Sequence, residues 1–371
     1  MCKKIINLIK DKFINLVHGL NVAITFNQKP DTKNDSNPID ADTFPALVPE
    51  SGIDTYAEWD SPETIQAVYE SLSLYHQVTL IEANEAAYQT LLQLKPDIVF
   101  NIAEGLHGIS REAQIPAMLE FLQIPYTGSD PMTLSICLDK ARTKEILAYH
   151  QIPTARFAII DSPQIPEGFD LKFPVFLKPN GEGSSKGIFS SSLVMDTASM
   201  MKEAEKMLSV YGGTVIAEEF LTGDEFTVAV MGNGADAVVL PMIRMDYSKL
   251  PEGVLPIFSY ETKWIYDTKE TPLDIYECPA KISPALEEQI KNTVLRTYSV
   301  LRCRDWSRID VRLSSDGVPN IIEVNPLPGI LPDPEEHSCY PASARAAGIG
   351  YKEMLNRVLT HAAKRYGLYE D

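Results

Sequence analysis

The stretch that decides the fold is Arg308-Ile-Asp310, followed after a glycine-containing turn by Glu323-Val-Asn325-Pro-Leu-Pro-Gly329. Side chains alternate between the faces of a strand, so Arg308 and Asp310 share one face, and Glu323 and Asn325 share another. If the two segments pair as a hairpin, these faces coincide. Two carboxylates and an amide oxygen suit Mg²⁺, with the arginine beside them as a donor to a developing anion. The alternative is an amphipathic hairpin with a solvated polar face, and the motif alone does not decide.

The composition limits the classes of protein to which the chain can belong. Its 371 residues exceed what one compact core usually holds, so two or three domains are expected. A net charge of −18 argues against a nucleic-acid partner and an anionic membrane, because both attract basic surfaces. The five cysteines are scattered without a CxxC pair, which favours the reducing cytoplasm and a role as small buried hydrophobes.

Residues 1–20 place apolar side chains at helical spacing with lysines between them. This pattern predicts an amphipathic N-terminal helix rather than a secretory signal. Contact with a membrane surface is the alternative to docking on a domain. No apolar run is long enough to span a membrane.

Strands and helices alternate over residues 21–139, which predicts an N-terminal α/β domain with a small parallel sheet. A strand is expected over Asn21–Phe26, and a polar stretch without periodicity follows it. Ser61 and Pro62 are the N-cap and first residue of an expected helix. Mixed patterns predict a central unit over residues 140–225.

Residues 226–371 form the third expected unit, which is α+β. Strands are predicted over Thr227–Met231 and Ala237–Met242, and a helix is predicted over Pro284–Tyr298. A long irregular stretch over residues 244–277 is typical of a lid.

A glycine- and serine-rich loop follows a predicted strand in Phe176-Leu-Lys178-Pro-Asn-Gly-Glu-Gly-Ser184-Ser185-Lys-Gly187. Glycines let backbone N–H groups approach a phosphate, the serine hydroxyls add donors, and Lys178 can reach a nucleotide from the strand. The spacing is not that of the Walker loop. A flexible hairpin is the alternative interpretation.

Two further segments carry polar groups in places that favour function. The acidic connection Glu218-Glu219-Phe-Leu221-Thr-Gly-Asp-Glu225 joins two apolar strands, where a hinge can offer backbone groups to a base and a carboxylate to hydroxyls. Lys140 begins a helix, against the dipole preference for acids at that end. The alternatives are a solvated turn and a surface lysine.

Taken in order, these segments resemble the ATP-grasp superfamily, and within it the D-alanine–D-alanine ligase-like branch. The motifs are IPYTGS at Ile124–Ser129, DKxxxK at Asp139–Lys144, LKPxxxGSSxG at Leu177–Gly187, EEFLTGDEFTV at Glu218–Val228, and then RIDV and EVNPLPG. The resemblance covers about residues 97–365. It implies a three-domain ATP-grasp fold of α/β and α+β class, with ATP between the central and C-terminal domains.

The resemblance also implies roles for individual residues. The expected ATP contacts are Lys140, Lys178, Ser184, Ser185, Glu218, Glu219, Leu221, Glu225 and Lys263. Asp310, Glu323 and Asn325 would ligate two Mg²⁺, with Mn²⁺ as the alternative metal. Arg308 and the backbone N–H of Gly329 would stabilise the oxyanion, while Ser184 and Lys263 would lie beside the reacting groups.

The chain departs from the family pattern where the substrates are expected. The family's glycine-rich loop after the first strand is replaced by Phe26-Asn-Gln-Lys-Pro-Asp, and the lid tyrosine is replaced by Trp264. Residues Leu331–Glu336 are inserted after Gly329. The expected substrate residues are Glu104, His107, Arg111, Trp264, His337 and Ser338. For His107 the alternative is a structural role, and for Arg111 an ion pair with Glu112.

From these departures we expect an ATP- and Mg²⁺-dependent ligase that joins an amino acid to a second small molecule through a phosphorylated intermediate. The expected setting is specialised metabolism, such as the synthesis of mycosporine-like amino acids. One alternative is a D-alanine–D-alanine ligase, and another is a nucleotide-binding protein without turnover. A homodimer through the N-terminal domain is also expected.

Overall fold

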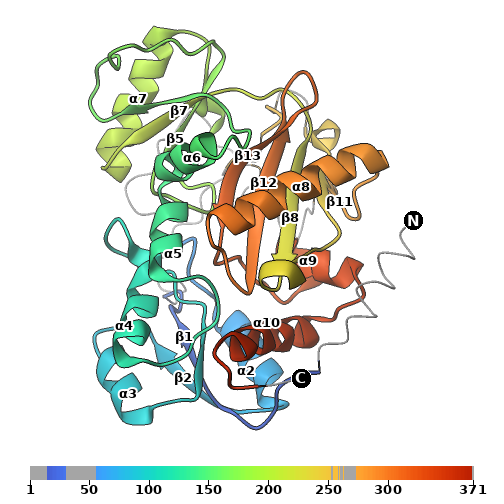
Figure 1. Cartoon of the computed structure of the whole chain (residues 1–371). Helices are drawn as coiled ribbons and strands as arrows, with labels where there is room; N and C mark the ends of the chain where they lie inside the picture. Colours follow the sequence, from blue (N-terminus) through green and yellow to red (C-terminus); the bar gives the residue numbers. More distant parts are fainter. Residues whose placement is uncertain are drawn as a thin grey trace.

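The computed structural model describes residues 15–30, 56–251, 254–257, 259, 262 and 273–369. It contains three β-sheets, which Figure 1 shows as three separate units. Residues 15–20 are not helical, in contrast to the expected amphipathic helix, whose residues 1–14 lie outside the described ones. The backbone is held here by long-range bonds instead: Val17 N–H donates to Thr360 Oγ1 (3.2 Å), and Gly19 N–H donates to the Tyr75 carbonyl (2.7 Å).

The N-terminal sheet has three parallel strands, in the order β2 (Gln77–Glu82), β1 (Asn21–Phe26), β3 (Ile98–Asn101). Parallel pairing requires crossover helices, which are α2 (Pro62–Ser73) and α3 (Ala87–Leu94). The predicted cap is confirmed, because Ser61 Oγ accepts from Thr64 N–H at 3.3 Å. The central strand β1 is buried, whereas β2 is an edge strand with exposed side chains.

Three further helices lead from this unit to the next. They are α4 (Gln114–Leu122), α5 (Pro131–Leu138) and α6 (Lys140–Tyr149). Asp130 caps α5 by accepting from Thr133 N–H at 2.9 Å, and Asp139 caps α6 by accepting from Arg142 N–H at 3.0 Å. The two caps fix the direction of α6, and with it the position of Lys140.

The central sheet is antiparallel, in the order β4 (Phe157–Ile160), β7 (Val215–Glu219), β5 (Val175–Pro179), β6 (Leu193–Val194). Helix α7 (Thr197–Tyr211) packs its buried residues Met200, Ala204 and Met207 on this sheet. Strands β7 and β5 are the two middle strands of this sheet, and they run in opposite directions.

The third sheet runs β11 (Tyr276–Glu277), β10 (Ile243–Met245), β8 (Glu225–Met231), β12 (Trp306–Leu313), β13 (Pro319–Asn325), and α8 (Pro284–Val300) packs on it. The strand predicted over Ala237–Met242 is only β9 (Val238–Val239). Both β9 and β10 pair with β8, and Pro241 lies between them. Proline has no N–H to donate, so it divides what would be one strand into two.

The last two helices return to the first unit. Helices α9 (Cys339–Ala346) and α10 (Tyr351–Arg365) follow β13, and α10 lies against α2 (Figure 1). Asn356 Nδ2 donates to the Ser71 carbonyl across this contact at 2.9 Å. One buried core therefore combines Val68 and Leu72 of α2 with Leu355 and Leu359 of α10.

Short 3₁₀ helices occur at Arg111–Ala113, Ser190–Ser192, Gly234–Asp236, Tyr247–Lys249 and Pro334–Glu336. No helix in the described part of the chain is long and apolar enough to cross a membrane.

Candidate active site

The expected hairpin forms, with β12 antiparallel to β13. Arg308 lies opposite Asn325, and Asp310 lies opposite Glu323. Directly opposed residues project from the same face of a sheet, so the four polar groups come together. Asp310 Oδ2 accepts from Arg308 Nη2 at 3.1 Å, and its Oδ1 accepts from Thr227 Oγ1 at 2.9 Å.

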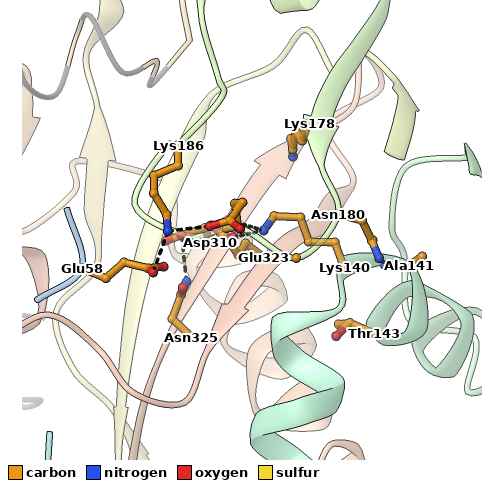
Figure 2. A network of polar contacts seen from close by, with 12 residues as sticks. Glu58, Lys140, Ala141, Thr143, Lys178, Asn180, Lys186, Asp310, Glu323 and Asn325 are labelled. Carbon is orange, nitrogen blue, oxygen red and sulfur yellow. Dashed lines mark hydrogen bonds and ion pairs between the residues drawn. The ribbon is translucent and has the colours of Figure 1, made fainter. Parts of the chain in front are cut away.

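Lys140 faces the other carboxylate of this pair. Its Nζ lies 2.9 Å from Glu323 Oε1, as Figure 2 shows. Burial alone would raise the pKa of the Glu323 carboxyl, but the charges of Lys140 and Arg308 outweigh it and hold the pKa at about 2. For Asp310, burial dominates over the attraction of Arg308 and raises its pKa.

Asn180 ties the start of α6 to the end of β5. Its side-chain oxygen accepts from Ala141 N–H at 2.9 Å, and its Nδ2 donates to Asp139 Oδ1 at 2.8 Å (Figure 2). Asn180 thereby holds Lys140, at the start of α6, beside the glycine-rich loop that follows β5. Lys140 Nζ also donates to the backbone carbonyl of Glu182 in that loop.

Two buried lysines share one buried carboxylate in the central unit. Lys178 Nζ lies 2.9 Å from Glu218 Oε2, and Lys144 Nζ lies 3.0 Å from Glu218 Oε1. Burial lowers the pKa of Lys144, and the charge of Glu218 only partly opposes this. Of this group, Lys178 and Glu218 border the cavity, so the Lys178 ammonium is placed where it could meet an anionic ligand.

Glu225 and Glu219 have different surroundings although they belong to one motif. Glu225 is buried and pairs with Arg312 Nη1 at 2.9 Å. Glu219 pairs with Arg156 Nη1 at 3.0 Å, and the Arg156 side chain is half exposed. Glu225 thus lies in the interior of the site, and Glu219 lies at its rim.

Most of the predicted residues border one cavity of about 410 Å³ between the central and third units. Its lining includes Glu104, Lys140, Lys178, Ser184, Ser185, Glu218, Glu219, Leu221, Glu225, Arg308, Asp310, Glu323, Asn325, Gly329, His337 and Ser338. Residues far apart in sequence are therefore gathered around one volume large enough for a small-molecule ligand.

The predicted substrate residues do not all reach the cavity. His107 is exposed, and its carbonyl accepts from Gln114 Nε2 at 2.7 Å, which agrees with a structural role. Arg111 pairs with Glu58 at 3.0 Å and with Glu182 at 3.5 Å, and not with Glu112 as the alternative had it. Lys263 and Trp264 lie outside the described residues.

The insertion after Gly329 does not separate the residues on either side of it. Ser338 Oγ donates to the Gly329 carbonyl at 3.0 Å. The His337 ring stacks on Tyr276, with the ring centroids 4.7 Å apart. The inserted residues form a short excursion that contains the 3₁₀ helix Pro334–Glu336.

Several residues of the site were not predicted from the sequence. Arg312 follows Asp310 by two positions on β12, so strand alternation could have indicated it. Lys186 lies inside the quoted glycine-rich loop, where its charge was a signal. Glu58 had no local signal, because the irregular segment before it carries no pattern that places it in the fold.

In the part of the chain that the structure describes, no group of three or more His, Cys, Asp or Glu side chains is arranged to hold a metal ion. The hairpin offers two carboxylates and one amide oxygen, which is a partial ligand set. Mg²⁺ is commonly held by one or two carboxylates together with substrate phosphates, so the donors present fit that ion.

Comparison with known proteins assigns the class. A family model described as the C-terminus of D-Ala–D-Ala ligase matches residues 147–360. A D-alanine–D-alanine ligase from Cupriavidus pinatubonensis is 36% identical over 268 residues, which are 72% of this chain and 76% of that protein.

Solved structures agree on the fold. The D-alanine–D-alanine ligase from Bacillus anthracis superposes with a TM-score of 0.66 at 23% identity, covering 94% of this chain and all of that one. VanG D-Ala:D-Ser ligase from Enterococcus faecalis gives a TM-score of 0.64 at 20% identity, covering 92% and 99%. The fold is that of the ATP-grasp ligases, as predicted.

The chain belongs to the D-alanine–D-alanine ligase family. It is therefore an ATP-dependent ligase that forms a carbon–nitrogen bond and releases ADP, as the sequence predicted. The expectation of specialised metabolism, with mycosporine-like amino acids as the example, is wrong. Relatives with 33% to 36% identity are named D-alanine–D-alanine ligases, which agrees better with the alternative kept above.

Proposed function

We propose that the protein is a D-alanine–D-alanine ligase. The first D-alanine carboxylate attacks the γ-phosphorus of ATP, the bond from that phosphorus to the β,γ-bridging oxygen breaks, and ADP leaves as the acyl phosphate forms. The amine of the second D-alanine then attacks that carbonyl carbon, a proton is lost from nitrogen, and phosphate departs. The observation that carries the proposal is the pairing of Arg308 and Asp310 with Asn325 and Glu323 at one wall of the shared cavity.

ATP would occupy the part of the cavity between β7 and β13. Lys140 and Lys178 would contact phosphates, and Ser184 and Ser185 would donate from the glycine-rich loop. The two lysines at this wall support the placement, since phosphoryl transfer depends mainly on charge neutralisation and positioning. Glu218, Glu219 and Leu221 would border the adenine, and the buried Glu225 would accept from ribose hydroxyls.

Asp310, Glu323 and Asn325 are the residues that would hold Mg²⁺. The bound ion would neutralise charge on the transferred phosphoryl group. The cations Arg308 and Lys140, which now pair with these carboxylates, would be free to turn toward the anionic substrate. Arg308 and the Gly329 N–H would stabilise the tetrahedral oxyanion.

The amino acids would bind at the end of the cavity nearest the N-terminal unit. Glu104 is half-buried in this wall, and burial together with the charge of Glu112 raises its pKa. Glu58 and Glu112 border the cavity beside it, and an incoming ammonium group would be stabilised by these carboxyl groups. Ser338, His337, Lys263 and Trp264 would complete the binding of the second amino acid, and Arg111 would support the first from behind.

The test measures ADP release with ATP and Mg²⁺, adding D-alanine, L-alanine, D-serine or no amino acid. D-alanine should stimulate release at least tenfold over L-alanine, and mass spectrometry should detect the D-alanyl-D-alanine dipeptide. Stimulation by none of the amino acids would reject the proposal. If a mixed dipeptide forms only when D-serine is added, the second substrate is D-serine and not D-alanine.

The division into domains at residues 20, 139 and 225 is also part of the proposal, as is a homodimer through the N-terminal unit. Support for the dimer comes from exposed apolar side chains near the edge strand β2, among them Leu80, Tyr88, Leu92 and Phe121. Exposed apolar patches of this kind often mark contacts between proteins. We also propose a cytoplasmic location, which fits the four described cysteines, none of which forms a disulfide.

A further inference from the structure

The N-terminal unit contacts both flanks of the glycine-rich loop. Arg111 Nη1 donates to the Gly181 carbonyl at 2.8 Å, before the serines. Glu58 Oε2 lies 3.0 Å from Lys186 Nζ, after the serines. Arg111 and Glu58 are joined to each other, because Arg111 Nη2 donates to both Glu58 oxygens at 3.1 and 3.0 Å.

The loop between these two contacts has an unusual backbone. Ser184 and Ser185 have φ values of 50° and 59°, in the left-handed region that costs an L-residue roughly 1 kcal/mol or more. Two such residues in succession persist only where their surroundings hold them. Lys186 provides that hold through Glu58 and through Glu182, whose Oε2 lies 2.5 Å from Nζ.

The contact is close and buried. A Cβ atom at Gly183 would meet Glu58 Oε1, so a side chain there would displace the Glu58 carboxylate from its present position. The side chains of Glu58, Arg111 and Lys186 are each no more than 8% exposed. Ion pairs that are buried to this extent are strongly coupled, and removal of one partner leaves the other uncompensated.

We infer that Glu58, Arg111 and Lys186 form a latch by which the N-terminal unit positions the phosphate-binding serines. This inference rests on the proposed function. The latch holds Ser184 and Ser185 in their strained conformation before ATP arrives. ATP binding therefore does not have to supply the free energy that orders the loop. Glu58 and Arg111 act through the loop, and they are positioning residues rather than catalytic ones.

The first measurement needs no substrate. Lys186→Met keeps the length of the side chain and removes its charge, and Lys202→Met changes an exposed lysine on α7 as a matched control. Hydrogen exchange of the amides of residues 184–187 should accelerate at least tenfold in the Lys186 variant and stay unchanged in the control. Unchanged exchange in Lys186→Met would overturn the latch.

The second measurement concerns binding. The Kd of a non-hydrolysable ATP analogue should rise about tenfold in Lys186→Met and in Glu58→Gln, and the double variant should be no worse than either single one. In turnover, KM for ATP should rise, while KM for the amino acid changes less than twofold. Additive losses in the double variant would contradict a shared latch.

The two proposals fail in different ways. If D-alanine gives no turnover but the analogue binds and shows the predicted losses, the substrate assignment fails and the latch remains. If turnover with D-alanine is normal in Lys186→Met and exchange is unchanged, the latch fails and the enzyme assignment remains. Arg111→Lys should retain only part of the analogue affinity, because a single ammonium lacks the two separate nitrogens by which Arg111 contacts Gly181 and Glu58.

Discussion

Asp310 and Glu323 are opposed on neighbouring strands, yet each carboxylate has a cation of its own. Arg308 pairs with Asp310, and Lys140 pairs with Glu323. Like charges at directly opposed positions destabilise a sheet, so the two cations offset a cost that the hairpin would otherwise carry. This arrangement gives Glu323 the lowered pKa expected of a carboxylate that is charged throughout the physiological range.

The first prediction concerns this carboxylate. Glu323→Gln keeps the shape of the side chain and removes a charged metal ligand, so the rate of ADP release should fall by about 100-fold or more. Circular dichroism should show an unchanged fold. Glu205→Gln, on the exposed side of α7, should keep its full rate. Near-normal turnover in the Glu323 variant would contradict the ligand assignment.

A second prediction concerns pH and Glu112. Burial, with the charge of Glu58 adding to it, raises the pKa of Glu112 to about 8. The folded state therefore binds more protons than the unfolded state between about pH 4.5 and 8, and its free energy of unfolding falls as pH rises through that window.

Urea unfolding at pH 5.5 and pH 8 measures this effect. The wild type should lose about 1 to 3 kcal/mol more than Glu112→Gln between the two pH values, after allowance for the partial exposure of the group. An equal loss in both proteins would show that Glu112 is ionised in the folded state throughout this range.

At the scale of elements, the C-terminal helix α10 completes the core of the N-terminal unit. Leu355 and Leu359 are fully buried in that core beside residues of α2. Leu359→Ala should lower the free energy of unfolding by about 2 to 5 kcal/mol, because it leaves a cavity. Lys352→Ala, on the exposed face of the same helix, should change it by less than about 0.5 kcal/mol. Chemical denaturation measures both, and similar losses would contradict the packing described.

Elements with local signals could be predicted from the sequence. The cap at Ser61 and Pro62 indicated α2, and alternation indicated the hairpin of β12 and β13. The break at Pro241 also had a local cause and was missed, because the apolar residues around it continue without interruption. The non-helical course of residues 15–20 depends on bonds to Thr360 and Tyr75, which no local pattern reveals.

The residues of the site also differ in whether a local sequence signal predicted them. Residues in ordered motifs, such as Lys140, Lys178 and Glu323, were predicted and do border the cavity. The place of Glu58 in the site depends on tertiary contacts alone, so its role can be recognised only from the three-dimensional structure. The ion pair expected between Arg111 and Glu112 was wrong for the same reason. Glu112 is the neighbour in sequence, whereas the observed partner, Glu58, is distant in sequence.

At the scale of the whole molecule, the exposed apolar side chains of β2, α3 and α4 predict a dimer. Phe121 is 77% exposed, and its ring lies 6.5 Å from that of Tyr88. Leu92→Glu should convert a dimeric wild type to a monomer in sedimentation velocity, because burial of a charge opposes association. Ile165→Glu, an exposed position in the central unit, should remain dimeric. A monomeric wild type at about 50 µM would reject the interface.

The packing of α10 on α2 also affects how the chain is made. Strand β1 and helix α2 leave the ribosome long before residues 351–365 are translated, and until then their shared apolar surface has no cover. The first unit therefore cannot finish folding until α10 has been made, although domains usually fold in order from the N-terminus. Products of premature termination would expose this surface permanently, and chaperones or proteases that recognise apolar segments would retain or remove them.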